Sequence, residues 1–152
     1  GKGGRHLGKK SLVIIAAEVR GAGTGRIRLR VGDQSKESLL GFVQAAVSPG
    51  STVITDGLPV YRNLLDMGYR HLPKVPKNHP SEATQLLPRV HRVAALLKRW
   101  VMGIHQGSVS KLRLPGYLNE FTFRFNRRAS AERGMVFYRL VQQAVVTGPK
   151  MR

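Results

Sequence analysis

The sequence predicts an α/β fold in which one mixed β-sheet is flanked by helices. Residues 11–20 (SLVIIAAEVR) are rich in β-branched side chains, and residues 26–31 (RIRLRV) alternate between Arg and aliphatic side chains, as paired strands do. Residues 51–56 (STVITD) predict a third strand with little polar alternation, which is expected in a sheet covered on both faces. Helical periodicity over residues 36–47 and 88–102 supplies the flanking layers.

The remaining elements follow from local signals for turns and caps. The Gly-rich break at residues 21–25 predicts an antiparallel hairpin between the first two strands. Ser35 is a plausible N-cap for the helix over 36–47, and Pro49-Gly50 ends that helix. We then predict a short helix over residues 59–67, a strand over 69–75 and a loop over 76–84. Two further helices are predicted over 112–128, interrupted by Pro115-Gly116, and over 131–146.

Length and composition indicate about one globular domain, because the chain has 152 residues of which 41% are hydrophobic. We expect residues 1–10 to be a flexible basic loop, residues 11–147 to form the domain and residues 148–152 to be a tail. The sequence contains no Cys, which excludes disulfides and thiolate zinc sites. No apolar stretch approaches the ~20 residues that a membrane span needs, and no signal peptide is visible, so we expect a cytoplasmic protein without a membrane partner.

The charge of the chain points to a polyanionic partner. There are 26 Lys and Arg residues against 8 Asp and Glu residues, which gives a net charge of +18. Domains this basic usually bind nucleic acid, because neutralising phosphates releases condensed counterions. A membrane-surface protein would concentrate its charge on one amphipathic helix, whereas here the charge is spread along the chain.

The candidate catalytic residues are Asp56, His91 and Lys98. Asp56 closes the third strand, at the carboxyl end where ligands gather in α/β sheets. His91 and Lys98 lie two turns apart on one helix, so the three side chains can surround one point with a metal-binding carboxylate, a second ligand and a phosphate-binding cation. The simpler alternatives are an Asx turn at Asp56, a half-buried His bonded to a carbonyl, and a solvated Lys.

Helical periodicity separates buried from exposed faces in the two helices that carry most of the candidate cations. Over residues 88–102 the buried face is followed by the stripe that holds His91 and Lys98, and then by the stripe of Arg92 and Arg99. In residues 112–128, aromatic residues pack inward while an outer face carries Arg124, Arg127 and Arg128. These cations are candidates for DNA binding, although an amphipathic helix with a positive end explains the second set equally well.

Several segments, taken in order, resemble the catalytic domain of bacterial insertion-sequence transposases of the DDE superfamily. The closest subgroup is the ISXO type, in which His or Asn can replace the third acidic residue. The segments that carry the resemblance are residues 49–57 (PGSTVITDG), 88–91 (PRVH), 97–100 (LKRW), 102–103 (MG), 117–121 (YLNEF) and 125–128 (FNRR).

The resemblance implies an RNase H-like fold and a role for each candidate. Asp56 corresponds to the second catalytic aspartate, His91 stands in place of the glutamate, and Lys98 holds a phosphate near the scissile bond. Such enzymes use two divalent ions, Mg²⁺ or Mn²⁺, to activate the attacking oxygen and stabilise the leaving one. Water first exposes a 3′ hydroxyl at the element's end, and that hydroxyl then attacks target DNA. The implied partners are element and target DNA, within a homo-oligomer.

The chain departs from this family pattern in two ways. The family's first catalytic aspartate lies on a strand that precedes a Gly- and Lys-rich loop, and this sequence begins inside such a loop. We therefore interpret residues 11–147 as a partial catalytic domain that lacks one strand and one ligand, and expect it to be inactive by itself. The imidazole of His91 is also a poorer ligand for Mg²⁺ than for Mn²⁺. The alternative is a non-catalytic basic nucleic-acid-binding protein of a ribosomal or architectural type.

Overall fold

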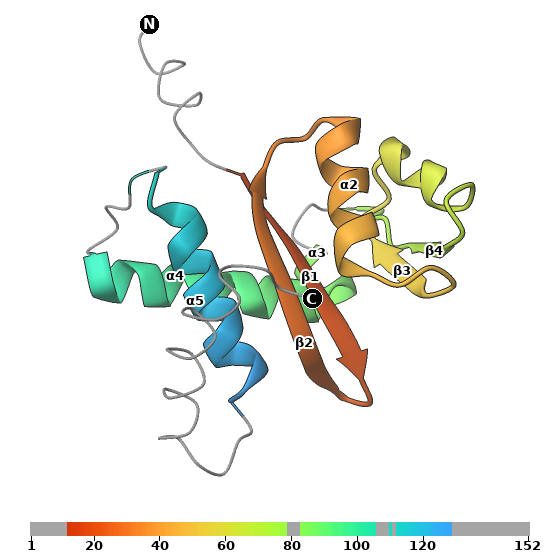
Figure 1. Cartoon of the computed structure of the whole chain (residues 1–152). Helices are drawn as coiled ribbons and strands as arrows, with labels where there is room; N and C mark the ends of the chain where they lie inside the picture. Colours follow the sequence, from red (N-terminus) through yellow and green to blue (C-terminus); the bar gives the residue numbers. More distant parts are fainter. Residues whose placement is uncertain (1–11, 79–82, 106–109, 111, 129–152) are drawn as a thin grey trace, which may run out of the picture.

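The computed structural model describes residues 12–78, 83–105, 110 and 112–128 (Figure 1). The predicted basic loop, the helix over 131–146 and the tail lie outside these residues. The described elements are β1 (Leu12–Arg20), β2 (Gly23–Gly32), α2 (Lys36–Ala46), β3 (Thr52–Thr55), the 3₁₀ helix η1 (Pro59–Leu64), β4 (Arg70–Pro73), α3 (Ala83–Leu86), α4 (Pro88–His105) and α5 (Leu114–Asn126).

Strands β1 and β2 form the predicted antiparallel hairpin. Their register runs from Leu12 opposite Gly32 to Arg20 opposite Gly23, with a shift near Glu18. The turn between them has only two residues, 21 and 22, and is therefore shorter than the predicted break at residues 21–25. Gly21 adopts a positive φ of 57°, which Gly tolerates best. The residues after that turn belong to β2, so the wider break was wrong.

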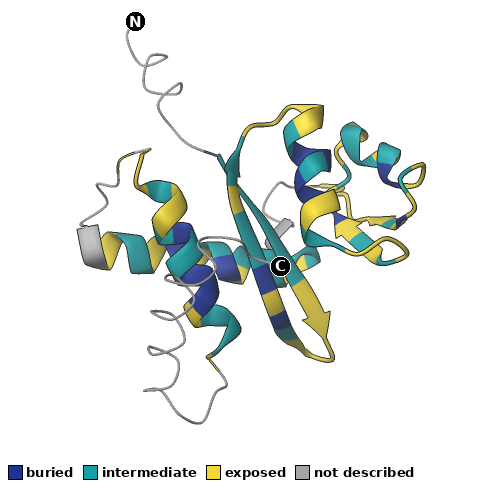
Figure 2. Cartoon of the chain, in the orientation of Figure 1, coloured by how far each residue is buried: buried dark blue, intermediate teal, exposed yellow. Residues whose placement is uncertain are grey.

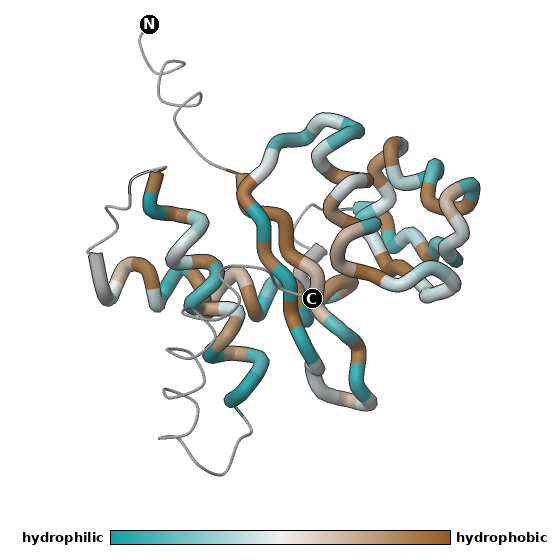
Figure 3. The backbone as a smooth tube through the Cα atoms, viewed as in Figure 1, coloured by the Kyte–Doolittle hydropathy of each residue, from teal (hydrophilic) through white to brown (hydrophobic). Residues whose placement is uncertain are grey.

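One face of the hairpin builds the larger core against α4 and α5. Strand alternation places aliphatic side chains of both strands on this face, and Ile27 is only 1% exposed. Between the two helices, the ring of Trp100 lies 5.7 Å from that of Phe121. Figure 2 shows the buried segments of β2, α4 and α5 facing one another, while Figure 3 shows hydrophobic and hydrophilic residues alternating along β2.

Side chains of α5 and of the residues after it bind backbone groups of Ile27 and Thr24 on the outer edge of β2. The backbone N–H of Ile27 donates to Oδ1 of Asn126 at 2.7 Å, and Nδ2 of Asn126 donates to the carbonyl of Ile27 at 3.1 Å. Asn126 therefore pairs with β2 as a neighbouring strand would. Arg128 binds the carbonyl of Thr24, and Arg89 binds two carbonyls at the hairpin turn. The hairpin is thus tied to both helices by polar contacts as well as by its apolar face.

A smaller core joins α2, η1, β3 and β4 on the other side of the hairpin. Ser35 caps α2 as predicted, since its side chain accepts from the N–H of Ser38 at 3.1 Å. Leu40, Leu64 and Tyr69 are buried together, and the hydroxyl of Tyr69 donates to the carbonyl of Val47 at 2.8 Å. Strands β3 and β4 pair in parallel next to this cluster.

The α/β class is confirmed, but the predicted single mixed sheet is not what the structure shows. The described strands form two separate sheets, antiparallel β1–β2 and parallel β3–β4. The physical reason is that no strand in the described part of the chain joins β1 to β3, so their facing edges make no ladder. Two smaller corrections concern helices: Pro115 belongs to the first turn of α5 rather than interrupting a helix, and the segment from Pro59 is a 3₁₀ helix.

Substituting Asn126 tests the contact between α5 and β2. We expect Asn126→Asp to lower the free energy of unfolding by about 1–3 kcal/mol, because it removes the donor to the Ile27 carbonyl and places a carboxylate beside that oxygen. Chemical denaturation measures the change. The matched control is Asn119→Asp on the same helix, which we expect to cost much less. Equal losses in the two variants would contradict a special role for Asn126.

Candidate functional site

Asp56 is held in a well-defined turn at the end of β3. Its carboxylate oxygen Oδ1 accepts the backbone N–H of Leu58 at 3.2 Å, which is an Asx turn. Gly57 has a φ of 86°, and a Cβ at that position would collide with the side chain of Val75, so the position strongly favours Gly. The simpler sequence interpretation, a local turn, is therefore confirmed. The turn also fixes an exposed carboxylate at the carboxyl end of the strand.

A polar network behind Asp56 was missed by the sequence analysis. The side chain of His71, on β4, is 2.7 Å from Oγ1 of the buried Thr55, and the same oxygen accepts the N–H of Gly57 at 3.1 Å. The ring of His71 also lies 6.4 Å from that of Tyr61. Alternation along two parallel strands was the only available signal, because it places Thr55 and His71 on one face of their sheet.

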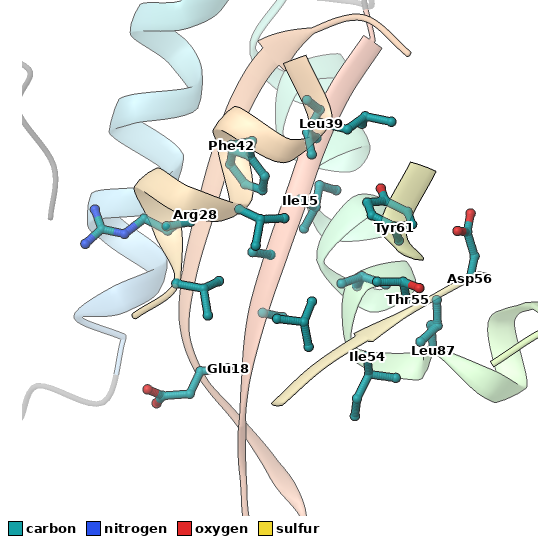
Figure 4. A pocket seen from close by; sticks show the side chains of 18 of the residues that line it. Ile15, Glu18, Arg28, Leu39, Phe42, Ile54, Thr55, Asp56, Tyr61 and Leu87 are labelled. Atoms are coloured by element: carbon teal, nitrogen blue, oxygen red, sulfur yellow. The ribbon is translucent and has the colours of Figure 1, made fainter. Parts of the chain in front are cut away.

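Tyr61 reports the charge of Asp56. Burial raises the pKa of the Tyr61 phenol, and the negative charge of Asp56 raises it further. Figure 4 shows the two side chains on the same side of the cleft between β1 and β3.

Helix α4 presents His91 and Lys98 as its periodicity predicts. Val93 and Leu97 are buried, His91 is half-buried, and Lys98 is exposed. The stripe beyond them, Arg92 and Arg99, is also exposed. The helix therefore has a buried apolar face, a border that holds His91, and a cationic outer surface.

The cleft between the two sheets brings the turn at Asp56 near the start of α4. Asp56, Leu87 and Val90 all line it, and His91 follows Val90 in the same helix turn. Neither His91 nor Lys98 is among the lining residues. The convergence of Asp56, His91 and Lys98 on one point thus stays a prediction.

Asp56 is the described residue whose chemistry suits a metal-ligand position. Carboxylate oxygen suits Mg²⁺ and Mn²⁺, and Mg²⁺ is often held by one or two carboxylates together with substrate phosphates, so the chemistry of Asp56 fits one ligand position. Within the described part of the chain, however, no group of three or more His, Asp or Glu residues is placed to hold an ion. A two-metal centre therefore needs ligands beyond this set.

The cations of α5 have structural contacts of their own. Arg124 pairs with Glu120 at 3.1 Å, and the guanidinium groups of Arg127 and Arg128 lie 3.8 Å and 3.9 Å from the ring centres of Phe123 and Phe125. Stacking of this kind orders the arginines at the end of the helix. The exposed cations of α4 have no such ring contacts among the described residues, which makes α4 the more open of the two surfaces.

Comparison with known proteins decides the family. A family model described as the ISXO2-like transposase domain matches residues 1–126. The chain belongs to this family. It is thus related to insertion-sequence transposases, which act on DNA and typically use divalent metals. No curated protein and no solved structure gives a significant match. Among the described helices of this transposase domain, none is both long and apolar enough to cross a membrane.

The titration of Tyr61 tests the placement of Asp56. We expect Asp56→Asn to lower the pKa of Tyr61 but to leave it above its ordinary value of about 10, because burial is the larger cause. An ultraviolet difference titration measures the change, with Tyr61→Phe used to identify the transition. Asp66→Asn, an exposed neighbour, is the control.

The same coupling gives a direction for stability. Because the pKa of Tyr61 is raised in the folded state, its stabilising contribution is complete below about pH 10 and is lost as the pH rises through the folded-state pKa.

A pKa of Tyr61 that is unchanged in Asp56→Asn, or shifted equally by Asp66→Asn, would show that Asp56 does not face the phenol.

Proposed function

We propose that this chain is the DNA-binding, partly complete catalytic domain of an insertion-sequence transposase that cleaves DNA strands and joins them to a target. The family match over residues 1–126 carries the proposal. The rigid carboxylate of Asp56 at a strand end, beside a cleft, supports it. We expect the chain to bind DNA, and we expect cleavage and strand transfer to require metal ligands beyond those among the described residues.

In this proposal each candidate residue has a distinct task. Asp56 is one metal ligand, presented by its Asx turn. His91 is the second ligand, or a hydrogen-bond donor to the scissile phosphate, and Lys98 binds a phosphate of the DNA backbone. A bound pair of Mg²⁺ or Mn²⁺ ions would supply activation of the attacking oxygen and stabilisation of the leaving oxygen.

The exposed surface of α4 is the proposed DNA interface. Arg92, Lys98 and Arg99 recur at helical spacing on its solvent side, and they belong to a chain with a net charge of +18. Arg124, Arg127 and Arg128 extend the interface at the end of α5, where their ring and ion-pair contacts limit their freedom. A cytoplasmic location and a homo-oligomeric active complex, which pairs two element ends, complete the proposal.

A passive nucleic-acid-binding protein is the second candidate function. The net charge and the incomplete ligand set both favour it. It differs from the transposase proposal in one respect: a passive binder has no use for a carboxylate at the end of β3, so its DNA affinity does not couple Asp56 to a divalent metal.

Lys98 provides a test of the interface. We expect Lys98→Ala to weaken duplex DNA binding and to reduce the slope of log affinity against log salt by about 1, because one phosphate contact is lost. Fluorescence anisotropy over a series of salt concentrations measures both quantities. The control is Lys36→Ala, which removes an exposed cation from the first turn of α2. An equal slope for the wild-type chain and Lys98→Ala would remove Lys98 from the interface.

Asp56 separates the transposase proposal from passive binding. Without divalent metal, we expect Asp56→Asn to bind DNA more tightly than the wild type, because a negative charge near the phosphates is gone. On addition of Mn²⁺, the wild type should gain about fivefold in affinity relative to Asp56→Asn, which is at the lower end of typical coupling energies. Asp66→Asn should behave as the wild type does. Identical metal responses in all three proteins would favour the passive binder.

A further inference from the structure

Three arginines alternate along β2 with the residues that it gives to the larger core. The core residues are Ile27, Leu29 and Val31. Because successive side chains of a strand point to opposite faces, Arg26, Arg28 and Arg30 lie on the other face of the hairpin, the one that receives α2. Neighbouring arginines in this row are about 7 Å apart along the strand. That spacing is similar to the distance between successive phosphates of an extended nucleic-acid strand.

A groove of about 350 Å³ opens beside this row, between the last turns of α2 and the first two turns of α5. We call it the β2 groove. Arg28 and Arg30 line it from β2, and Asn119 lines it from α5, while its other walls are apolar. None of the described residues that line it is acidic. Figure 1 shows α5 and α2 on either side of β2, and Figure 4 shows the guanidinium of Arg28 directed away from the cleft and toward α5.

The charge of Arg30 is held in place at the wall of the groove. Its guanidinium lies 5.6 Å from the ring centre of Phe42, which is buried. An arginine placed over a ring keeps the donors at the edge of its guanidinium for a second ligand. The acidic residue of the hairpin, Glu18, pairs with Arg20 near the turn, whereas Arg30 lies near the other end of the ladder, opposite Ile14.

The outer edge of β2 beside the groove is too short to take a polypeptide strand. Asn126 already binds the outward N–H and C=O of Ile27, and Arg128 binds the carbonyl of Thr24. Outward-facing residues alternate in an antiparallel ladder, so the outward groups in the groove belong to Leu29 and Val31. Strands usually have about five or six residues, and this stretch offers fewer. Charge, and not strand pairing, is therefore what the groove offers a ligand.

We propose that the β2 groove binds the phosphodiester backbone of DNA, as a second contact surface separate from α4. The choice of DNA as the polyanion rests on the proposed function. The groove supplies two guanidinium groups, which bind phosphate in a bidentate manner, together with the amide of Asn119. Phe42 is the aromatic residue of the lining, and its ring is buried, so bases have no exposed ring on which to stack. The contact is with the backbone and is independent of base sequence.

The two cationic surfaces suit two separate DNA segments. Helix α4 turns Val93 and Leu97 toward the core that it shares with Ile27, so its exposed cations, Lys98 among them, point away from the hairpin. The β2 groove lies instead at the outer edge of the hairpin, between α2 and α5. A straight duplex along the solvent side of α4 therefore does not reach the groove. Strand transfer, as in the proposed function, brings two DNA segments together, and this arrangement lets one chain hold both.

Neutralising Arg30 tests the site. We expect Arg30→Gln to reduce the slope of log DNA affinity against log salt by about 1, because one phosphate contact is lost, and Arg30→Lys to keep the slope. The matched control is Arg26→Gln, which removes an exposed arginine from the same face of the same strand but not from the groove, and which we expect to leave the slope unchanged. Fluorescence anisotropy measures the slopes, and circular dichroism melting shows whether the variants fold as the wild type does.

Counting DNA duplexes per chain tests whether the groove holds a separate segment. Analytical ultracentrifugation with a fluorescent duplex of about ten base pairs, one helical turn, gives the ratio of duplex to chain at saturation. We expect the wild-type chain to bind a second duplex, and the double variant Arg28→Gln/Arg30→Gln to bind only one. Arg30→Glu, which reverses the charge at a single exposed position, should give the same loss if the double variant melts early. Self-association of the chain leaves this ratio unchanged.

Three results would overturn the proposal. Equal slopes for Arg30→Gln and Arg26→Gln would remove the groove from DNA binding, while a reduced slope for Lys98→Ala would still support the α4 interface. A second duplex bound by both Arg28→Gln/Arg30→Gln and Arg30→Glu would place that duplex elsewhere. A Glu-rich peptide that binds more tightly than DNA of equal charge, and loses this advantage in Arg30→Gln, would identify an acidic polypeptide as the ligand. No DNA binding by the wild-type chain would instead overturn the proposed function, and this inference with it.

Discussion

The pairing of backbone groups along the β1–β2 hairpin is the constraint on which the rest of the structure depends. One face of the hairpin supplies the wall of the larger core against α4 and α5. The opposite face receives α2, where Phe42 is buried and the guanidinium of Arg30 lies 5.6 Å from its ring centre. Both helical layers are thus positioned by one pair of strands. On the outer edge of that pair, the amide of Asn126 binds the backbone N–H and C=O of Ile27, as a neighbouring strand would.

The end of β3 sets the geometry of the candidate site around Asp56. Local turn chemistry at Asp56 and Gly57 fixes the carboxylate, and the contact between Thr55 and His71 braces it from behind. The cleft that separates the sheets passes beside this turn.

The cations of α4 and those at the end of α5 have different surroundings in this transposase domain. On α5, Arg127 and Arg128 lie against aromatic rings, and Arg128 also holds the hairpin through the carbonyl of Thr24. On α4, Arg92, Lys98 and Arg99 face solvent beyond a well-packed apolar side. A polyanion approaching the molecule therefore meets cations of which some are already engaged and others are open.

Much of the local structure was determined by the sequence alone. The cap at Ser35, the hairpin, the turn at Asp56 and the two faces of α4 follow from residues a few positions apart, because turns, caps and helical stripes are made of short-range hydrogen bonds and periodicity. The bond between Asn126 and Ile27, which are 99 positions apart, and the contact of Thr55 with His71 were decided by the tertiary structure. So was the division into two sheets, since a strand's own sequence shows that it suits a covered position but not whether a neighbour lies beside it.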